Sequence, residues 1–457
     1  MEPTDPLDRA KALIVKGDKD AAIQELSLFL NTDFYHEEAL LMLGACLQEK
    51  GFNGFSAVLT SAAVDARSAR GKPFPEALMN LGAAYKAEHK NDTAARIWAD
   101  ALSQETLPRE RAKIMTNISG LYINENQPET AIEWCDRALE QDPRNYGAMA
   151  NRGLACLEMG RWSEGWAGFR ATYATGDRPK RNYRDLPNWD GTPGQHVIAW
   201  GDQGIGDEIF NASCLNDLGS VCRRVTLDCH PRIENLFRRS FPEMTVHGTR
   251  KNLSELDWLH DSDAEATVGL ADLPGIFRKQ GEWDGKPYLT AAAIDRGTTP
   301  PRIGLSWTGG SKRTRTDLRS LPLGALEPIL AARPDAQWFS LQYTPDAARQ
   351  VCELEEKTGI RISHYPGWVE CFDYDRTALF ITSLDLVITV TTSVHDLAGA
   401  LGIPNWTLVP SRTGWRYQRD GDTLPWYNST RLYRQIKDGE WGGIIDVVAR
   451  DLKEWTT

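Results

Sequence analysis

A helical pattern that repeats about every 34 residues constrains the fold of this chain more than any other feature. Residues 1–175 show helical spacing of apolar side chains and almost no strand pattern. The steps from Ala94 to Ala131 and from Ser119 to Gly153 are close to the tetratricopeptide period of ~34 residues. Since a helix pair of this kind buries its apolar face only by stacking on its neighbours, we predict a tetratricopeptide-like α-helical repeat array over 1–175.

The sequence predicts the fold of this array but leaves its role open. One interpretation is a concave groove that binds a protein, a peptide or a glycan acceptor. The other is a scaffold or dimerisation surface, since repeat arrays often pair, which would make the protein a homodimer. The repeat pattern alone leaves both interpretations open.

The periodicity changes after a connector. Residues 176–195 are rich in Pro, Gly, Asp and Arg, a composition typical of a linker. Beyond it, short apolar runs alternate with helical segments, which is the pattern of parallel sheets with crossover helices. We predict two Rossmann-like lobes, one over 196–295 and one over 296–457, with the last helix near 440–455 crossing back to the first lobe. The expected strands are 196–200, 225–228, 302–307, 337–341, 384–390 and 405–408.

Composition argues against a nucleic-acid partner and against a membrane location. The net charge of -11 disfavours general nucleic-acid binding, which needs a basic surface. No uncharged apolar run reaches the ~20 residues of a membrane span, and the start of the chain lacks the apolar stretch of a signal peptide. We therefore expect a cytoplasmic protein without a membrane span. The 8 cysteines show no metal-ligand spacing, so we expect no metal site.

A glycine-rich turn follows the first predicted strand and opens a helix. In doubly wound sheets, ligands bind at the carboxyl ends of the strands. Gly204 and Gly206 permit a tight turn and close backbone approach there. Asp207 stands at the mouth of this turn, where a carboxylate can take a proton from an attacking hydroxyl. The alternative is that Asp207 only caps the following helix.

A second glycine pair and a basic loop follow the first strand of the second lobe. Gly309 and Gly310 can offer backbone N–H groups to an anion. Lys312 and Arg319 belong to a concentration of positive charge that suits a diphosphate in an otherwise acidic protein. A solvated basic loop is the alternative. Gln342, at the end of a later strand, is a candidate contact for the base or ribose of a nucleotide.

A third motif places hydroxyl residues between a strand and a helix. Thr391, Thr392 and Ser393 can cap this helix, and Val394 lies in its first turn. Free N–H groups and the helix dipole favour phosphate at such a position. Capping alone would also explain the hydroxyls, so this motif has two interpretations.

These segments occur in the order of a known catalytic domain. The runs RNYRDLPNWDG, GDQGIGDEI, SWTGG with RSLPL, DLVITVTTSVHDLAGALGIP and LPWYNSTRLYRQ resemble tetratricopeptide-linked bacterial glycosyltransferases. That group is related to the heptosyltransferases (glycosyltransferase family 9) and is more distantly similar to the O-linked N-acetylglucosamine transferases. The resemblance implies a GT-B fold with two Rossmann-like lobes, no metal or other cofactor, and a nucleoside-diphosphate sugar as co-substrate, with the donor on the C-terminal lobe.

The resemblance also assigns roles and shows departures. It implies that Asp207 is the general base and that Arg319, with Lys312 nearby, meets donor phosphate. Related sequences often carry His directly before Leu-Ala-Gly; here that residue is Asp396, and His395 lies one position earlier. A one-residue shift turns a helical side chain by about 100°. The predicted donor site includes both His395 and Asp396, but a contact from the histidine to the donor is not assumed.

The main hypothesis is an inverting, metal-independent glycosyltransferase that uses a nucleoside-diphosphate sugar and Asp207 as base. The alternative is a tetratricopeptide protein-binding module whose second half is a degenerate, non-catalytic scaffold. A sugar-nucleotide epimerase or phosphorylase on the same two-lobed plan is a third hypothesis. The donor base, the sugar and the acceptor cannot be read from these motifs.

Overall fold

A computed structural model describes residues 5–249, 256–292, 300–310, 316–369 and 373–456. The predicted donor contact Lys312 lies outside these ranges. The chain divides into two compact units, Met1–Cys156 and Leu157–Thr457. No helix of the described residues has both the length and the apolar character that crossing a membrane requires.

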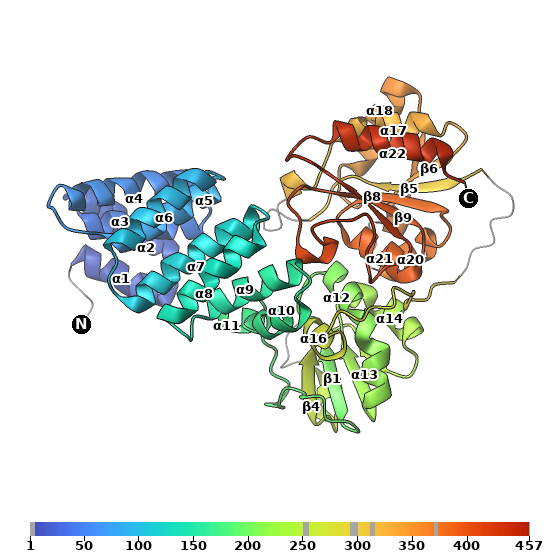
Figure 1. Ribbon diagram of the computed structural model, residues 1–457, viewed down its shortest axis with the longest axis horizontal. Coiled ribbons are helices and arrows are strands. Elements are labelled where there is room, and N and C mark those ends of the chain that lie inside the picture. The colour runs from blue at the N-terminus through green and yellow to red at the C-terminus, as the bar shows by residue number, and fades with distance from the viewer. Residues whose placement is uncertain (1–4, 250–255, 293–299, 311–315, 370–372, 457) are drawn as a thin grey trace. The chain divides into compact units, whose positions relative to one another are not determined.

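The first unit is a series of helices in which neighbours along the chain pack on one another (Figure 1). The predicted tetratricopeptide-like repeats are thereby confirmed. A Cβ atom on Gly82 would overlap the indole of Trp98, whose Nε1 donates to the carbonyl of Met79 at 2.9 Å. The small residue is therefore what lets paired helices approach closely. The helices are α1 (Pro6–Lys16), α2 (Lys19–Leu30), α3 (Glu37–Glu49), α4 (Asn53–Ser68), α5 (Pro75–Ala87), α6 (Asn91–Gln104), α7 (Pro108–Asn124), α8 (Pro128–Gln141) and α9 (Tyr146–Glu158), which ends just inside the second unit.

The second unit begins earlier than the predicted boundary at 175. Helices α10 (Trp162–Phe169) and α11 (Thr172–Thr175) belong to it. The reason is aromatic packing: the Trp166 ring lies 5.3 Å from that of Trp415, centroid to centroid. The connector after them is also held in place, because the buried Arg178 side chain contacts Asp202 at 2.7 Å and Asp272 at 3.0 Å.

Two parallel sheets form the rest of the unit, as the strand–helix alternation predicts. The first has the order β3-β2-β1-β4 and the second β10-β9-β8-β5-β6-β7. Four strands (β3, β4, β7 and β10) are absent from the predicted set, and two of these are only three residues long. The strands are β1 (His196–Trp200), β2 (Arg224–Asp228), β3 (Thr245–His247), β4 (Ala266–Gly269), β5 (Arg302–Ser306), β6 (Gln337–Ser340), β7 (Ile362–His364), β8 (Leu386–Val390), β9 (Asn405–Val409) and β10 (Thr430–Arg434).

Helices lie between the strands along the chain (Figure 1). The first sheet carries α12 (Ile205–Asn211), α13 (Leu215–Val221), α14 (Glu234–Ser240), α15 (Asp257–His260) and α16 (Leu273–Phe277). The second carries α17 (Glu327–Ala332), α18 (Ala347–Thr358), α19 (Pro366–Val369), α20 (Tyr374–Ile381), α21 (Ser393–Leu401) and α22 (Gly442–Glu454).

The last helix stays with the second sheet. Ile445, Val448 and Leu452 of α22 pack in one core cluster with Leu305 of β5 and Leu408 of β9. The predicted crossing to the first lobe is therefore wrong, because the apolar face of α22 is buried on its own sheet.

Close helix packing joins the two sheets. Helices α12 and α21 contact each other. A Cβ on Gly206 would lie 2.5 Å from Oδ2 of Asp396 and 3.3 Å from Cα of Ser393. Both helices follow the carboxyl end of a strand, so their first turns meet where the two sheets approach.

Candidate functional site

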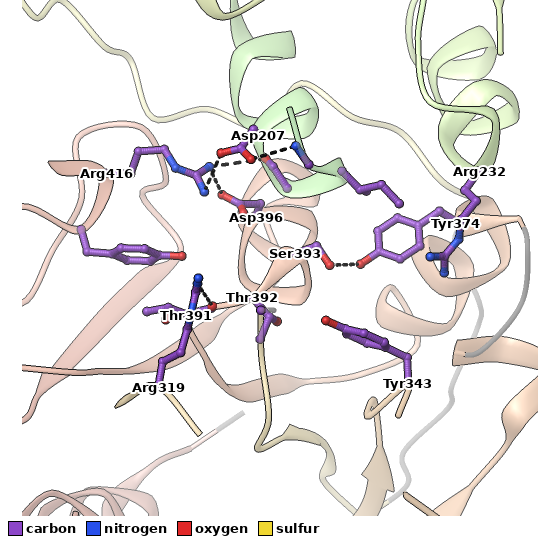
Figure 2. A pocket seen from close by; sticks show the side chains of 15 residues that line it. Asp207, Arg232, Arg319, Tyr343, Tyr374, Thr391, Thr392, Ser393, Asp396 and Arg416 are labelled. Carbon is purple, nitrogen blue, oxygen red and sulfur yellow. Dashed lines mark hydrogen bonds and ion pairs between the residues drawn. The ribbon is translucent and has the colours of Figure 1, made fainter. Parts of the chain in front are cut away.

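A cavity of about 340 Å³ lies at this meeting point (Figure 2). Three segments that each follow a strand supply most of its wall, as expected for ligand sites of doubly wound sheets. The lining residues are Gly204, Ile205, Gly206, Asp207, Arg232, Gly310, Arg319, Tyr343, Tyr374, Thr391, Thr392, Ser393, Asp396, Arg416 and Tyr417.

The N-terminus of α21 opens into the cavity. Thr392 is the N-cap, and its Oγ1 accepts from the backbone N–H of Val394 at 3.1 Å. Tyr374 donates to Oγ of Ser393 at 2.7 Å, and Nη1 of Arg319 donates to the carbonyl of Thr391 at 3.0 Å. The capping interpretation and an anion site are thus compatible, because one guanidinium lies beside the positive end of the helix.

The glycine pair has two separate roles. Gly309 does not line the cavity; a Cβ there would overlap the methyl group of Thr392, and its N–H donates to Oγ of Ser320 at 3.3 Å. Gly310 lines the cavity and has a φ of 84°, which favours glycine. Gly309 therefore permits close approach to the start of α21 rather than offering its own N–H to an anion.

Asp207 both caps its helix and faces the cavity. Its Oδ2 accepts from the N–H of Gly204 at 3.0 Å, and its Oδ1 lies 3.2 Å from Nη2 of Arg416. The side chain is 35% exposed, which leaves it reachable from the cavity. The capping interpretation of Asp207 is therefore confirmed, and its role as a proton acceptor stays a prediction.

Asp396 is the buried counterpart of Asp207. Its Oδ1 accepts from Nη1 of Arg416 at 3.1 Å and from the Tyr427 hydroxyl at 3.4 Å. Burial raises the pKa of the Asp396 carboxyl to about 7, an effect that the charge of Arg416 opposes and that of Asp207 reinforces. One arginine thus serves two carboxylates, as the dashed lines in Figure 2 show.

His395 points the other way. Its Nδ1 lies 2.8 Å from Oγ1 of Thr407 and 3.3 Å from Oδ1 of Asn405, both on β9. Burial, followed by the charge of Arg416, lowers the pKa of His395 to about 3, so the ring is neutral. His395 is not among the residues that line the cavity, so its inclusion in the predicted donor site is corrected. The reason is that neighbouring residues on a helix face different directions.

Two further predicted contacts lie outside the cavity. The side chain of Gln342 is buried and accepts from the N–H groups of Trp307 at 3.0 Å and Thr308 at 2.9 Å. It therefore braces the turn after β5 and has no surface for a base. Val394 is buried beneath the cavity wall as part of the core. Among the predicted residues, those that line the cavity are Gly204, Gly206, Asp207, Gly310, Arg319, Thr391, Thr392, Ser393 and Asp396.

Six lining residues were not among the predicted site residues: Ile205, Arg232, Tyr343, Tyr374, Arg416 and Tyr417. Arg416 lies in a Trp/Arg segment after β9, which the sequence leaves open between lining a cleft and packing. Arg232 follows β2, so the rule that sites lie after parallel strands would have found it. Tyr374 and Tyr417 carry no local signal, because an aromatic residue in a helical stretch is ordinarily a core residue. In the described parts of the chain, no group of three His, Cys, Asp or Glu side chains is arranged to hold a metal ion.

Comparison with known proteins gives distant similarities. No protein-family model matches the chain. Protein FlbA of Caulobacter vibrioides is 24% identical over 425 residues, which cover 83% of this chain and 70% of FlbA. An alignment of that extent must include parts of both units. The Photosystem I assembly protein Ycf3 of Synechococcus sp. is 30% identical over 80 residues, covering 17% of this chain and 46% of Ycf3.

Solved structures resemble part of the chain. MamA is 21% identical, with a TM-score of 0.31, and the match covers 37% of this chain and 94% of MamA. PilF of Pseudomonas aeruginosa is 15% identical, with a TM-score of 0.35, covering 52% of this chain and 90% of PilF.

Proposed function

We propose that the second unit is a glycosyltransferase of GT-B type, which binds a nucleoside-diphosphate sugar in the cavity and transfers the sugar to an acceptor hydroxyl with inversion. The observation that carries the proposal is the position of Asp207 opposite an anion site. That site is formed by the start of α21 and the guanidinium of Arg319. The resemblance of five sequence blocks to tetratricopeptide-linked glycosyltransferases agrees with this proposal.

The charges around the cavity suit a diphosphate. Arg232, Arg319 and Arg416 face two carboxylates, Asp207 and Asp396, and the dipole of α21 adds positive potential. An anion would gain charge-assisted hydrogen bonds from Arg319 and from the first turn of α21. The same groups would stabilise the negative charge that grows on the leaving diphosphate, which in comparable preorganised sites contributes several kcal/mol.

Asp207 would supply the proton transfer. Its carboxylate takes the proton of the acceptor hydroxyl while the new bond forms at the anomeric carbon and the bond to the diphosphate breaks. The ion pair with Arg416 fixes the orientation of this carboxylate, and Gly204 holds its second oxygen. This role requires that the acceptor compete with Arg416 for Oδ1.

The first test is binding. Thermal unfolding is measured with a panel of nucleoside-diphosphate sugars for the wild type, for Arg319→Ala and for Arg349→Ala. Arg349 is the matched control, because it lies on the surface helix α18, away from the cavity, and pairs with Asp346 and Glu353 of the same helix region. A ligand at ~100 times its Kd should add about 2.7 kcal/mol. We expect one nucleotide to stabilise the wild type and the control but not Arg319→Ala; no shift with any donor would contradict the proposal.

The second test is transfer. With the donor identified by binding, radiolabelled sugar is offered with protein and glycan acceptor extracts. Asp207→Asn should keep donor binding and lose transfer by a factor of about 10²–10⁴, the usual contribution of a positioned base. Full transfer by this variant would exclude Asp207 as the base.

A second candidate function rests on the first unit. Phe52, Phe55 and Val58 are 52%, 69% and 68% exposed and lie three residues apart at the start of α4. Residues at this spacing are neighbours on a helix surface, and exposed apolar groups of this kind mark protein-binding sites. We propose that the repeats bind a protein segment. Phe55→Ser should weaken the binding of a partner captured on the repeats without changing the donor-induced thermal shift. If no donor shifts the protein, this becomes the main function.

A further inference from the structure

Two carboxylates share one arginine in the cavity. Nη2 of Arg416 lies 3.2 Å from Asp207, and Nη1 lies 3.1 Å from Asp396. With both carboxylates charged, these three side chains carry a net charge of -1, which the charge of Arg319 opposes from the same cavity. Asp396 is 2% exposed, so water cannot screen that charge there.

The Asp396 carboxylate lies where the proposed diphosphate would bind. Asp396 is in the first turn of α21, the helix whose N-terminus forms the anion site, and it lines the same cavity. A charged carboxylate at that point would repel a diphosphate, whereas a neutral carboxyl group would donate a hydrogen bond to it. Since Oδ1 accepts from both Arg416 and Tyr427, the proton would be carried by Oδ2, which lies against Gly206.

We propose that Asp396 takes up one proton from solvent when the donor binds and then acts as a neutral hydrogen-bond donor in the diphosphate site. This inference rests on the proposed function and adds a residue role to it. Asp396 would thereby make donor affinity depend on pH, a role separate from that of Asp207 as the proposed base.

The other groups that face Asp396 do not account for such a proton at neutral pH. Burial raises the pKa of each neighbouring tyrosine, so these hydroxyls stay neutral. The lowered pKa of His395, on the same helix, keeps its ring neutral. Asp207 is the remaining carboxylate of the cavity among the described residues and is tested directly below. The titratable and charged groups around Asp396 are Asp207, Tyr288, Arg319, Tyr374, His395, Arg416, Tyr417 and Tyr427.

The direction of the effect follows from linkage. Burial already raises the pKa of Asp396 to about 7 in the free protein, and a bound anion would raise it further. Below pH 7 the carboxyl group is protonated before binding, so affinity should be constant. Above it, each binding event must take up a proton, and affinity should fall towards tenfold per pH unit.

The experiment is isothermal titration calorimetry with the nucleoside-diphosphate sugar identified by thermal shift, from pH 6 to about 9. A sugar nucleotide is the suitable probe, because a free terminal phosphate titrates near about pH 6 and would add its own proton. Each pH is measured in two buffers of different ionisation enthalpy, so that the difference in heat counts the protons exchanged. We compare the wild type, Asp396→Asn and Asp207→Asn.

We expect the wild type to take up close to one proton above pH 8 and to lose affinity there. Asp396→Asn should bind the donor with an affinity that does not change with pH and without proton exchange, since an amide mimics the neutral acid. Asp207→Asn should keep the proton uptake but with its onset moved to lower pH, because the charge of Asp207 helps to raise the pKa of Asp396. A wild type that binds at pH 8 to about 9 without proton uptake overturns the inference, even if Asp396→Asn does not fold. Absence of any sugar-nucleotide binding at every pH instead overturns the proposed function.

Discussion

The guanidinium of Arg416 lies 3.2 Å from Oδ1 of Asp207, so the proposed base enters the cavity as half of an ion pair. The other half of the guanidinium is committed to Asp396, and its Nη1 also lies 3.4 Å from the carbonyl of Gly206. Arg416 lies in the segment after β9 of the second sheet, whereas Asp207 lies in the first turn of α12, which follows β1 of the first sheet. The arginine therefore links the stability of the sheet interface to the charge state of the site.

Replacing Arg416 by Met should destabilise the second unit by about 3 kcal/mol, the usual cost of leaving a buried charge without its partner. Removing the stranded charge as well should restore part of this loss, so Asp396→Asn in the Arg416→Met background is expected to be more stable than Arg416→Met alone. Urea unfolding of the four proteins in this double-mutant cycle gives the coupling energy. Additive effects of the two substitutions would contradict the pairing.

The buried, neutral ring of His395 should make the folded protein less stable at acid pH. Its pKa is lowered to about 3 from the usual 6.5, because the neutral ring is buried against β9. The stability that this provides is complete above pH 6.5 and is lost as the pH falls towards 3. Asp396 acts in the opposite direction: its contribution is largest below pH 4 and is lost as the pH rises through about 7.

The two contributions separate in single variants. His395→Asn should remove the acid sensitivity, so its stability relative to the wild type should improve steadily from pH 6.5 down to 4. Asp396→Asn should show the reverse trend relative to the wild type over the same interval. Thermal unfolding by circular dichroism at matched ionic strength measures both. Parallel pH profiles for wild type and His395→Asn would show that the ring is not buried as a neutral group.

The sequence could predict those parts of the fold that leave a pattern in a short stretch of residues. The helical period and the strand-helix alternation are properties of short windows, and β1 occupies His196–Trp200, the predicted 196–200. The strand order β10-β9-β8-β5-β6-β7 depends on contacts between distant segments. Short strands such as β3 give too few residues for a period to show.

The site shows the same limit. Residues that follow a strand, such as Asp207 and Thr392, are placed by the parallel-sheet rule. Arg416 reaches the cavity from a loop whose path depends on tertiary packing of Trp415, so no local pattern identifies it. The orientations of His395 and Asp396 depend on the exact start of α21, which the repeated hydroxyl residues leave ambiguous by one position.

Gly206 should tolerate no side chain. A Cβ there would meet Oδ2 of Asp396 at 2.5 Å and the backbone of Ser393 at 3.3 Å, so Gly206→Ala must push the two helices apart. Overpacking of this kind costs about 1–3 kcal/mol. Gly324→Ala is the control, because nothing lies within 4 Å of a Cβ at that position. Thermal unfolding should rank Gly206→Ala clearly below the control, and equal stability would mean that α12 and α21 are not in close contact.

Arg178 links the connector to the turn that presents Asp207. Its guanidinium is buried, contacts Asp202 and Asp272, and lies 4.0 Å from the ring centroid of Tyr173. Arg178→Met removes the cationic partner of two carboxylates, of which Asp272 keeps only the hydrogen bond from the Tyr173 hydroxyl among the contacts described, and should destabilise the second unit by about 3–5 kcal/mol. Because Asp202 precedes the Gly204–Asp207 turn while Arg319 and α21 lie on the other sheet, the remaining folded protein should bind donor with little change in Kd and lose transfer.

Donor calorimetry and a transfer assay on the same preparation separate these effects, with unfolding measured by urea. Equal losses of donor affinity and transfer would mean that Arg178 stabilises the whole unit without a specific effect on the turn. Arg178→Lys serves as the partial control, since it keeps the charge but cannot bridge both carboxylates with a planar fork. Its transfer rate should fall between those of the wild type and Arg178→Met, while its donor affinity stays close to that of the wild type.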